Sequence, residues 1–119
     1  MMTIDEIRAD RDLVNAIDWD MTPEEAVRLY LEWGNNWASG NYVIRSRDDV
    51  SHYFVVNTWK DDPVIYLVRR NSDEAVDLAE IQLPPDLKSQ YCLTHGDHKG
   101  VWALDDTIKN WLKKELNAA

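Results

Sequence analysis

Three runs of β-branched and aromatic residues lie close together in the middle of the chain, and the short links between them restrict how they can pair. The runs are YVIRS, HYFVVNTW and VIYLVRR, between residues 42 and 70, and the turn-like stretches RDD and KDDP separate them. This composition is typical of strands. A parallel connection needs a dozen or more residues, whereas antiparallel neighbours can be joined by a short turn. We therefore predict a three-stranded antiparallel meander over residues 42–70.

The second of these runs carries large apolar groups on both of its faces. Successive side chains of a strand point to opposite sides of the sheet. One side takes His52, Phe54, Val56 and Thr58, and the other takes Tyr53, Val55, Asn57 and Trp59. This pattern predicts a middle strand that is covered, at least in part, on both faces.

Two helices are predicted before the strands. The first covers residues 3–17, begins with a capping box formed by Thr3 and Glu6, and repeats apolar residues at helical spacing. Two arginines interrupt its apolar stripe, so we expect residues 1–20 to be a loosely packed helix. The second helix covers residues 21–34, where a threonine and a proline stand at the first positions.

Three further helices are predicted after the strands, over residues 71–83, 85–95 and 105–116, with a short extended piece at residues 100–104. Strands grouped in the middle and helices grouped at the ends are typical of the α+β class. A three-stranded sheet needs a helix layer to bury its apolar face. The sequence therefore predicts a single α+β domain over residues 1–119, in which N- and C-terminal helices pack the three-stranded antiparallel meander.

The charge and cysteine content restrict the partners and the compartment. The 119 residues carry a formal net charge of −9, which disfavours nucleic acid and anionic membrane surfaces as partners. The one cysteine permits no internal disulfide, which indicates a reducing compartment. The first residues lack the bases and the apolar run of a signal peptide, and no apolar stretch has the length of a membrane span. We expect a cytoplasmic protein.

The stretch CLTHGDHKG crowds metal-binding side chain types together. Cys92, His95, Asp97 and His98 fall within seven residues, and all are suitable ligands for zinc. On a helix that ends near Gly96, the first two would share one face, and a turn could fold the others back towards them. The alternative is structural: a buried cysteine, a histidine that suits the negative end of a helix, and a solvated loop. Known zinc patterns use two separated pairs, so one local cluster has low specificity.

No catalytic arrangement emerges from the sequence. Cys92 could act as a nucleophile with His95 or His98 as its base, but such partners usually come from elsewhere in a fold. The paired acidic residues all stand at predicted helix starts or turns, where local backbone chemistry explains them. Phosphate-binding loops, nucleophile elbows and dinucleotide fingerprints are absent from the sequence. The residues therefore favour a protein that is not an enzyme, without excluding one.

The chain is unusually rich in tryptophan, with six tryptophans and five tyrosines but one phenylalanine. Trp33 and Trp37 are four residues apart and could stack on one helix face if the helix continues past Gly34. Aromatic clusters of this kind occur at interaction hot spots, and they also fill the cores of small domains. If contact residues are named, they are Trp33 and Trp37, with Trp59 as a third.

The segments LYLEWGNNW, HYFVVNTW, RRNS and KGVWAL…IKNWLKKEL, in this order, resemble small uncharacterised bacterial proteins from sulfate reducers. The resemblance covers residues 22–117. That group has no assigned activity, so the resemblance implies no site residues.

Two functions therefore remain open, together with a small hydrolase or transferase as a third. The leading hypothesis is a non-enzymatic interaction or regulatory module that binds another protein and needs no cofactor. The alternative is a zinc-binding protein that uses Cys92, His95 and His98, with Asp97 as a further ligand. The partner and the oligomeric state do not follow from the sequence.

The metal hypothesis predicts near-stoichiometric zinc in the purified, untagged protein and a melting temperature that falls on chelation, because a bound metal stabilises the folded state. Replacing either Cys92 or His98 by alanine should abolish the binding. Elemental mass spectrometry and thermal melts with and without chelator measure both effects. Variants that bind zinc as the parent protein does would contradict the hypothesis.

Overall fold

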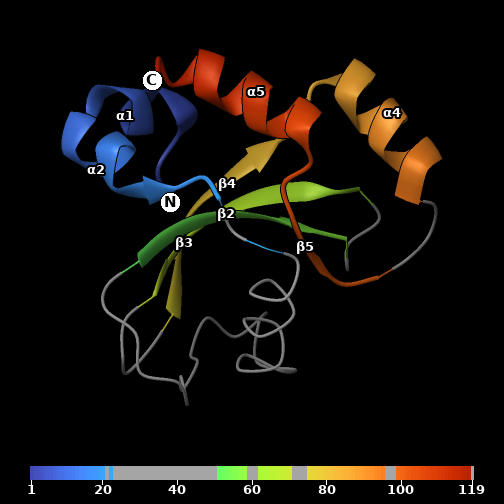
Figure 1. Cartoon of the computed structure of the whole chain (residues 1–119), viewed down its shortest axis with the longest axis horizontal. Helices are drawn as coiled ribbons and strands as arrows, with labels where there is room; N and C mark the ends of the chain where they lie inside the picture. Colours follow the sequence, from blue (N-terminus) through green and yellow to red (C-terminus); the bar gives the residue numbers. More distant parts are fainter. Residues whose placement is uncertain (21, 23–50, 59–61, 71–74, 96–98, 119) are drawn as a thin grey trace.

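The computed structural model describes residues 1–20, 22, 51–58, 62–70, 75–95 and 99–118, with the backbone alone at residues 70, 75 and 95. Within these residues the chain is α+β, with four helices and a five-stranded mixed sheet (Figure 1). The predicted helix at 21–34 and the predicted first strand YVIRS lie outside the described residues, apart from Thr22. The α+β class is confirmed.

Two of the predicted strands form the centre of the sheet. β2 (Ser51–Asn57) and β3 (Val64–Arg70) pair in antiparallel register over seven residues each. Phe54 lies opposite Leu67, and Val56 lies opposite Ile65. Their composition and the short link between them therefore predicted both the strands and their antiparallel pairing correctly.

The prediction of a helix over residues 71–83 is wrong. Ala75–Gln82 instead form a strand, β4, that pairs antiparallel with β3. Alanine and glutamate favour a helix by propensity, but β3 offers an unpaired backbone edge, and strand formation satisfies it. The alternation of the segment fits this role, since Ala79 and Ile81 are buried whereas Gln82 is exposed. Tertiary context thus overrides the local preference.

The prediction of a purely antiparallel, three-stranded sheet is also wrong. β1 (Ile17–Asp18) pairs with β2 in parallel, and β5 (Val101–Ala103) pairs with β2 in antiparallel orientation. Both lie on the edge of β2 that β3 does not occupy, β1 beside its first half and β5 beside its second half. The expected extended piece at 100–104 is thus confirmed, whereas the two-residue β1 is too short to leave a sequence pattern.

The first predicted helix is divided into α1 (Ile4–Ala9) and α2 (Arg11–Ala16). The Thr3–Glu6 capping box at its start is present, with both hydrogen bonds at 3.2 Å. Asp10 separates the two helices, because its carboxylate accepts a hydrogen bond from the backbone of Leu13 and so starts a new helix.

These first helices are joined to the C-terminal helix, α5 (Asp106–Glu115), by two arginines. The Arg8 guanidinium donates to the backbone carbonyl of Glu115. Arg11 donates to the carbonyls of Leu116 and Asn117, both at 2.8 Å. The last carbonyls of a helix have no partner within the helix, so the arginines complete the end of α5. The two arginines that interrupt the apolar stripe therefore connect the two ends of the described chain.

The core lies between one face of the sheet and the described helices, which lie together on that side (Figure 1). Helices α1 and α2 contribute Ile7 and Val14, and α4 (Pro85–His95) contributes Tyr91. The whole buried cluster consists of Ile7, Val14, Ile17, Phe54, Val56, Ile65, Leu67, Ala79, Ile81, Leu83, Tyr91, Ile108, Leu112 and Leu116. Burying this much apolar surface is the main source of stability for a domain of this size.

The opposite face of the sheet is buried as well. Six of its side chains from β2 and β3 are buried, namely Tyr53, Val55, Asn57, Val64, Tyr66 and Val68. The expectation that β2 is covered on both faces is therefore confirmed. Among the described helices, none is both long and apolar enough to cross a membrane.

The assignment of residues 75–82 as a strand predicts opposite outcomes at two neighbouring positions. Ile81→Ala should lower the free energy of unfolding by about 2 to 4 kcal/mol, because Ile81 is 6% exposed and faces the helices. Gln82→Ala should change it by less than about 0.5 kcal/mol, because this side chain is exposed. Urea denaturation measures both values. Equal losses at the two positions would contradict the alternation.

Candidate functional site

The chain returns to the helix side of the sheet through α4 and the start of α5, and each helix has a local reason to begin where it does. Pro85 opens α4, and proline suits the first helical position because it lacks a backbone N–H. Asp105 caps α5, and its Oδ1 accepts a hydrogen bond of 2.8 Å from the backbone N–H of Ile108. Of the two leading aspartates, Asp105 is therefore the capping residue.

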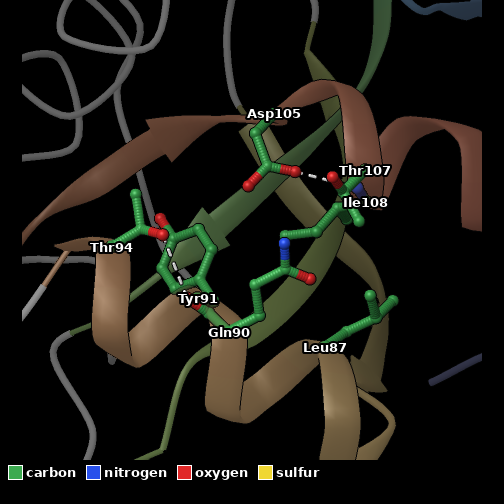
Figure 2. A pocket seen from close by; sticks show the side chains of 7 residues that line it. All are labelled: Leu87, Gln90, Tyr91, Thr94, Asp105, Thr107 and Ile108. Atoms are coloured by element: carbon green, nitrogen blue, oxygen red, sulfur yellow. Dashed lines mark hydrogen bonds between the residues drawn. The ribbon is translucent and has the colours of Figure 1, made fainter.

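A pocket of about 220 Å³ lies between α4 and the first turn of α5. Figure 2 shows its lining, in which side chains from both helices converge on one space. The lining residues are Leu87, Gln90, Tyr91, Thr94, Asp105, Thr107 and Ile108. The α4 residues are spaced by three or four positions, so they share one face of that helix.

The lining combines an apolar wall with hydrogen-bonding groups. Leu87, Ile108 and the Tyr91 ring supply the apolar surface, and Tyr91 is 3% exposed. One glutamine amide, two threonine hydroxyls and one aspartate carboxylate supply polar groups. Small-molecule sites commonly have this composition, with a few placed polar groups on a largely apolar surface.

Two of the polar groups have a fixed hydrogen-bonding sense. The Thr94 hydroxyl donates its proton to the carbonyl of Gln90 at 3.0 Å, so lone pairs are what this oxygen can offer to a ligand. One oxygen of Asp105 is used by Ile108, and the second is turned toward the interior of the pocket, over the side chains from α4 (Figure 2). Both groups therefore act as acceptors.

The environment of the pocket changes the pKa of the tyrosine that lines it. Burial raises the pKa of the Tyr91 hydroxyl above its ordinary value, and the negative charge of Asp105 and the Cys92 thiol raise it further. The phenol therefore stays in its neutral form at neutral pH. The same influence of Asp105 indicates that its charge is felt inside the pocket.

Two of the lysines on these helices, one on each, lie near an acid. Lys88 on α4 lies 2.9 Å from Asp62, and Lys109 on α5 lies 3.9 Å from Asp20. Among the described residues that line the pocket there is no lysine, arginine, histidine or cysteine. The described lining therefore holds one carboxylate and no nucleophile with an adjacent base.

The size of the pocket restricts its occupant. Cofactor and drug-sized ligands occupy cavities of roughly 300–1,000 Å³. A volume of about 220 Å³ instead suits a single side chain or a small molecule of similar size. The geometry therefore fits an anchoring site better than a site for cofactor chemistry.

The zinc hypothesis is only partly within the described residues. Cys92 is exposed on α4, and His95 follows three positions later on the same helix, as the sequence predicted. The His95 side chain and all of Asp97 and His98 lie outside the description. Within the part of the chain that is described, no three His, Cys, Asp or Glu residues form a group that could hold a metal. The four-residue site therefore stays a prediction, but the alternative of a buried Cys92 is wrong, because the side chain points to solvent.

The tryptophans predicted as contact residues, Trp33, Trp37 and Trp59, all lie outside the described residues, so this prediction stays open. The tryptophans that are described pack against the core instead. Trp19 lies with its ring 5.4 Å from that of Phe54. Trp102 donates from Nε1 to the Thr58 hydroxyl at 3.0 Å. These contacts are the expected core use of a tryptophan, whose N–H is satisfied when the ring is buried.

A second side chain with an altered pKa is His52, near the start of β2 on the face toward the helices. Burial lowers the pKa of His52 below its ordinary value, and the positive charge of Arg69, its partner on β3, lowers it further. His52 is therefore neutral at neutral pH. It does not line the pocket between α4 and α5.

Sequence reasoning identified one pocket residue, Asp105, and only as one of two candidates for a helix cap. The spacing of Leu87, Gln90, Tyr91 and Thr94 on a predicted helix was the available signal for the rest. It predicts a shared face, but it does not predict what faces it. The element that faces α4 is set by the position of β5, because α5 begins directly after it.

No protein-family model, curated protein or solved structure matches this chain. The resemblance to proteins of sulfate-reducing bacteria therefore stays a prediction. A function must be argued from the geometry.

The raised pKa of Tyr91 predicts a loss of stability in alkali. In the unfolded chain this tyrosine ionises with a pKa near 10, whereas in the folded chain it holds its proton to higher pH. Its contribution to stability is therefore complete below about pH 10 and is lost as the pH rises above that value. Tyr91→Phe removes the ionisable group, so its free energy of unfolding should fall less steeply between about pH 9 and 11. Parallel curves for the two proteins in urea denaturation would contradict the assignment.

Proposed function

We propose that this protein is a non-enzymatic binding module and that it recognises another protein with the surface formed by α4 and the start of α5. The observation that carries the proposal is the pocket between these helices. It is smaller than a cofactor site, its described lining lacks a nucleophile–base pair, and it presents hydrogen-bonding groups around an apolar wall. Such a site can anchor one side chain of a partner.

An exposed leucine stands beside this pocket on α4. Leu93 is 88% exposed, and it lies three residues after Gln90, at the edge of the helix face that lines the pocket. A single exposed leucine is common on protein surfaces. Its position next to a pocket is what gives it significance, because interfaces combine an apolar contact with an anchored side chain.

The overall charge supports a partner with basic groups. The net charge of −9 produces a negative field around the protein, and such a field speeds the encounter with a positively charged partner. The same field opposes binding to nucleic acid. Trp33, Trp37 and Trp59 remain our proposed additional contacts, on the grounds of their composition alone.

Site-directed photocrosslinking tests this proposal. A photoreactive amino acid at position 93 should give a covalent adduct of defined mass with a partner protein in the native cells. The same amino acid at position 114 is the matched control, because Lys114 is also exposed but lies near the opposite end of α5. The adduct counts as support once the purified partner binds the purified protein.

A companion variant, Leu93→Glu, replaces the apolar side chain at this position with a charged one. Its fold should be unaffected, because a side chain that is 88% exposed contributes little to stability. Its affinity for the purified partner, measured by calorimetry, should fall about tenfold or more if Leu93 is a central contact. Equal adducts at positions 93 and 114, or an unchanged affinity of Leu93→Glu, would contradict the proposed surface.

A further inference from the structure

We infer that the pocket between α4 and α5 receives a basic side chain, lysine or arginine, from the partner protein. This inference rests on the proposed function and specifies its chemistry. It follows from three properties of the pocket, which are the hydrogen-bonding sense of its walls, the charge at the two helix ends that form it, and its shape.

The walls with a fixed hydrogen-bonding sense accept rather than donate. Thr94 has already given its proton to the Gln90 carbonyl, and Asp105 presents its second carboxylate oxygen to the interior. An ammonium or guanidinium group consists of donors only, so it complements both. The Gln90 amide and the Thr107 hydroxyl can turn either a donor or an acceptor toward a ligand, so they do not oppose such a guest.

The charge at the pocket is negative despite the nearby start of a helix. The start of α5 carries about half a positive charge from its dipole, but Asp105 and Asp106 stand there with two full negative charges. Thr94 lies in the last turn of α4, where the helix dipole is negative. Of the described lysines on these helices, Lys88 and Lys109 lie beside Asp62 and Asp20, whereas Lys113 and Lys114 stand in the last turn of α5, away from the pocket. The balance therefore favours a cation and disfavours a phosphate or a carboxylate.

The shape suits a charged group on a long aliphatic stem. Leu87, Ile108 and the ring of Tyr91 form the apolar surface against which methylene groups can pack. Lysine and arginine commonly bury their stems in this way while the charged end reaches a polar group. The volume of about 220 Å³ accommodates one such side chain and is below the range of larger ligands.

Two adjacent aspartates, Asp105 and Asp106, provide a matched pair of variants. Asp105→Asn removes the charge in the pocket while keeping the cap of α5, because asparagine caps a helix about as well as aspartate. Asp106→Asn removes an equal charge from an exposed position that does not line the pocket. A third variant, Thr94→Val, removes the other fixed acceptor at an exposed position and keeps the shape of the side chain.

The probes are tripeptides with blocked ends, glycine–X–glycine, in which X is lysine, arginine, norleucine or glutamate. Norleucine keeps the aliphatic stem and lacks the charge, and 1,5-diaminopentane serves as a free amine. Chemical-shift titration of the full chain by NMR follows the amide signals of Thr94 and Thr107. A single anchored side chain should bind with a dissociation constant on the order of 1 mM.

The lysine or arginine peptide should shift both signals at saturable concentrations, and norleucine and glutamate should not. Asp105→Asn should weaken the binding about tenfold, Asp106→Asn less than about twofold, and Thr94→Val by an intermediate factor. Equal weakening by the two aspartate variants would overturn the inference, since it would indicate a general effect of net charge. Binding of norleucine equal to that of lysine would also overturn it, as would tighter binding of the free diamine than of either peptide.

The failure of this inference is distinguishable from the failure of the proposed function. A partner captured at position 93 that binds the parent protein and Asp105→Asn with equal affinity would leave the protein-binding module in place and remove the basic anchor. The absence of any specific partner at position 93, together with peptide binding that depends on Asp105, would instead indicate a cation pocket without the proposed docking surface.

Discussion

The backbone of β2 has to be paired along both of its edges, and the rest of the described fold follows from this requirement. Both faces of β2 are buried, so water is not available to its N–H and C=O groups. β3 satisfies one edge, and the other is shared by β1 and β5, one after the other. Segments more than eighty residues apart, Ile17–Asp18 and Val101–Ala103, therefore meet on one strand. The mixed character of the sheet is a consequence of this pairing.

The position of the pocket is a second consequence. The backbone of Thr58 donates to the carbonyl of Gly100 at 2.9 Å, and this bond places the start of β5 beside the end of β2. Asp105 follows β5 after one residue and begins α5 at once. Tyr91, which is buried in the core, fixes the facing helix. Two independently anchored helices thus define the space between them, and a carboxylate is held there by its role as a helix cap.

The two arginines of the first helices complete the arrangement from the opposite end of α5. Arg8 and Arg11 bind the last carbonyls of that helix, where backbone acceptors would otherwise lack partners. Asn117 adopts a left-handed conformation, with a φ of 52°, and ends the helix. α5 is therefore held at both ends, by Asp105 at its start and by the arginines at its end. A binding surface built on such a helix is positioned before a partner arrives, which reduces the entropic cost of binding.

Local chemistry determined the parts of this protein that the sequence predicts by itself. β-branched runs determined β2 and β3, Thr3 and Glu6 determined the start of α1, and a leading aspartate determined the start of α5. These elements depend on neighbours within a few residues. Tertiary structure decided β4, because its alanine and glutamate favour a helix until the edge of β3 is present, and it decided β1, which is too short to show a period. It also decided the pocket, because a helix face in the sequence does not reveal the element opposite it.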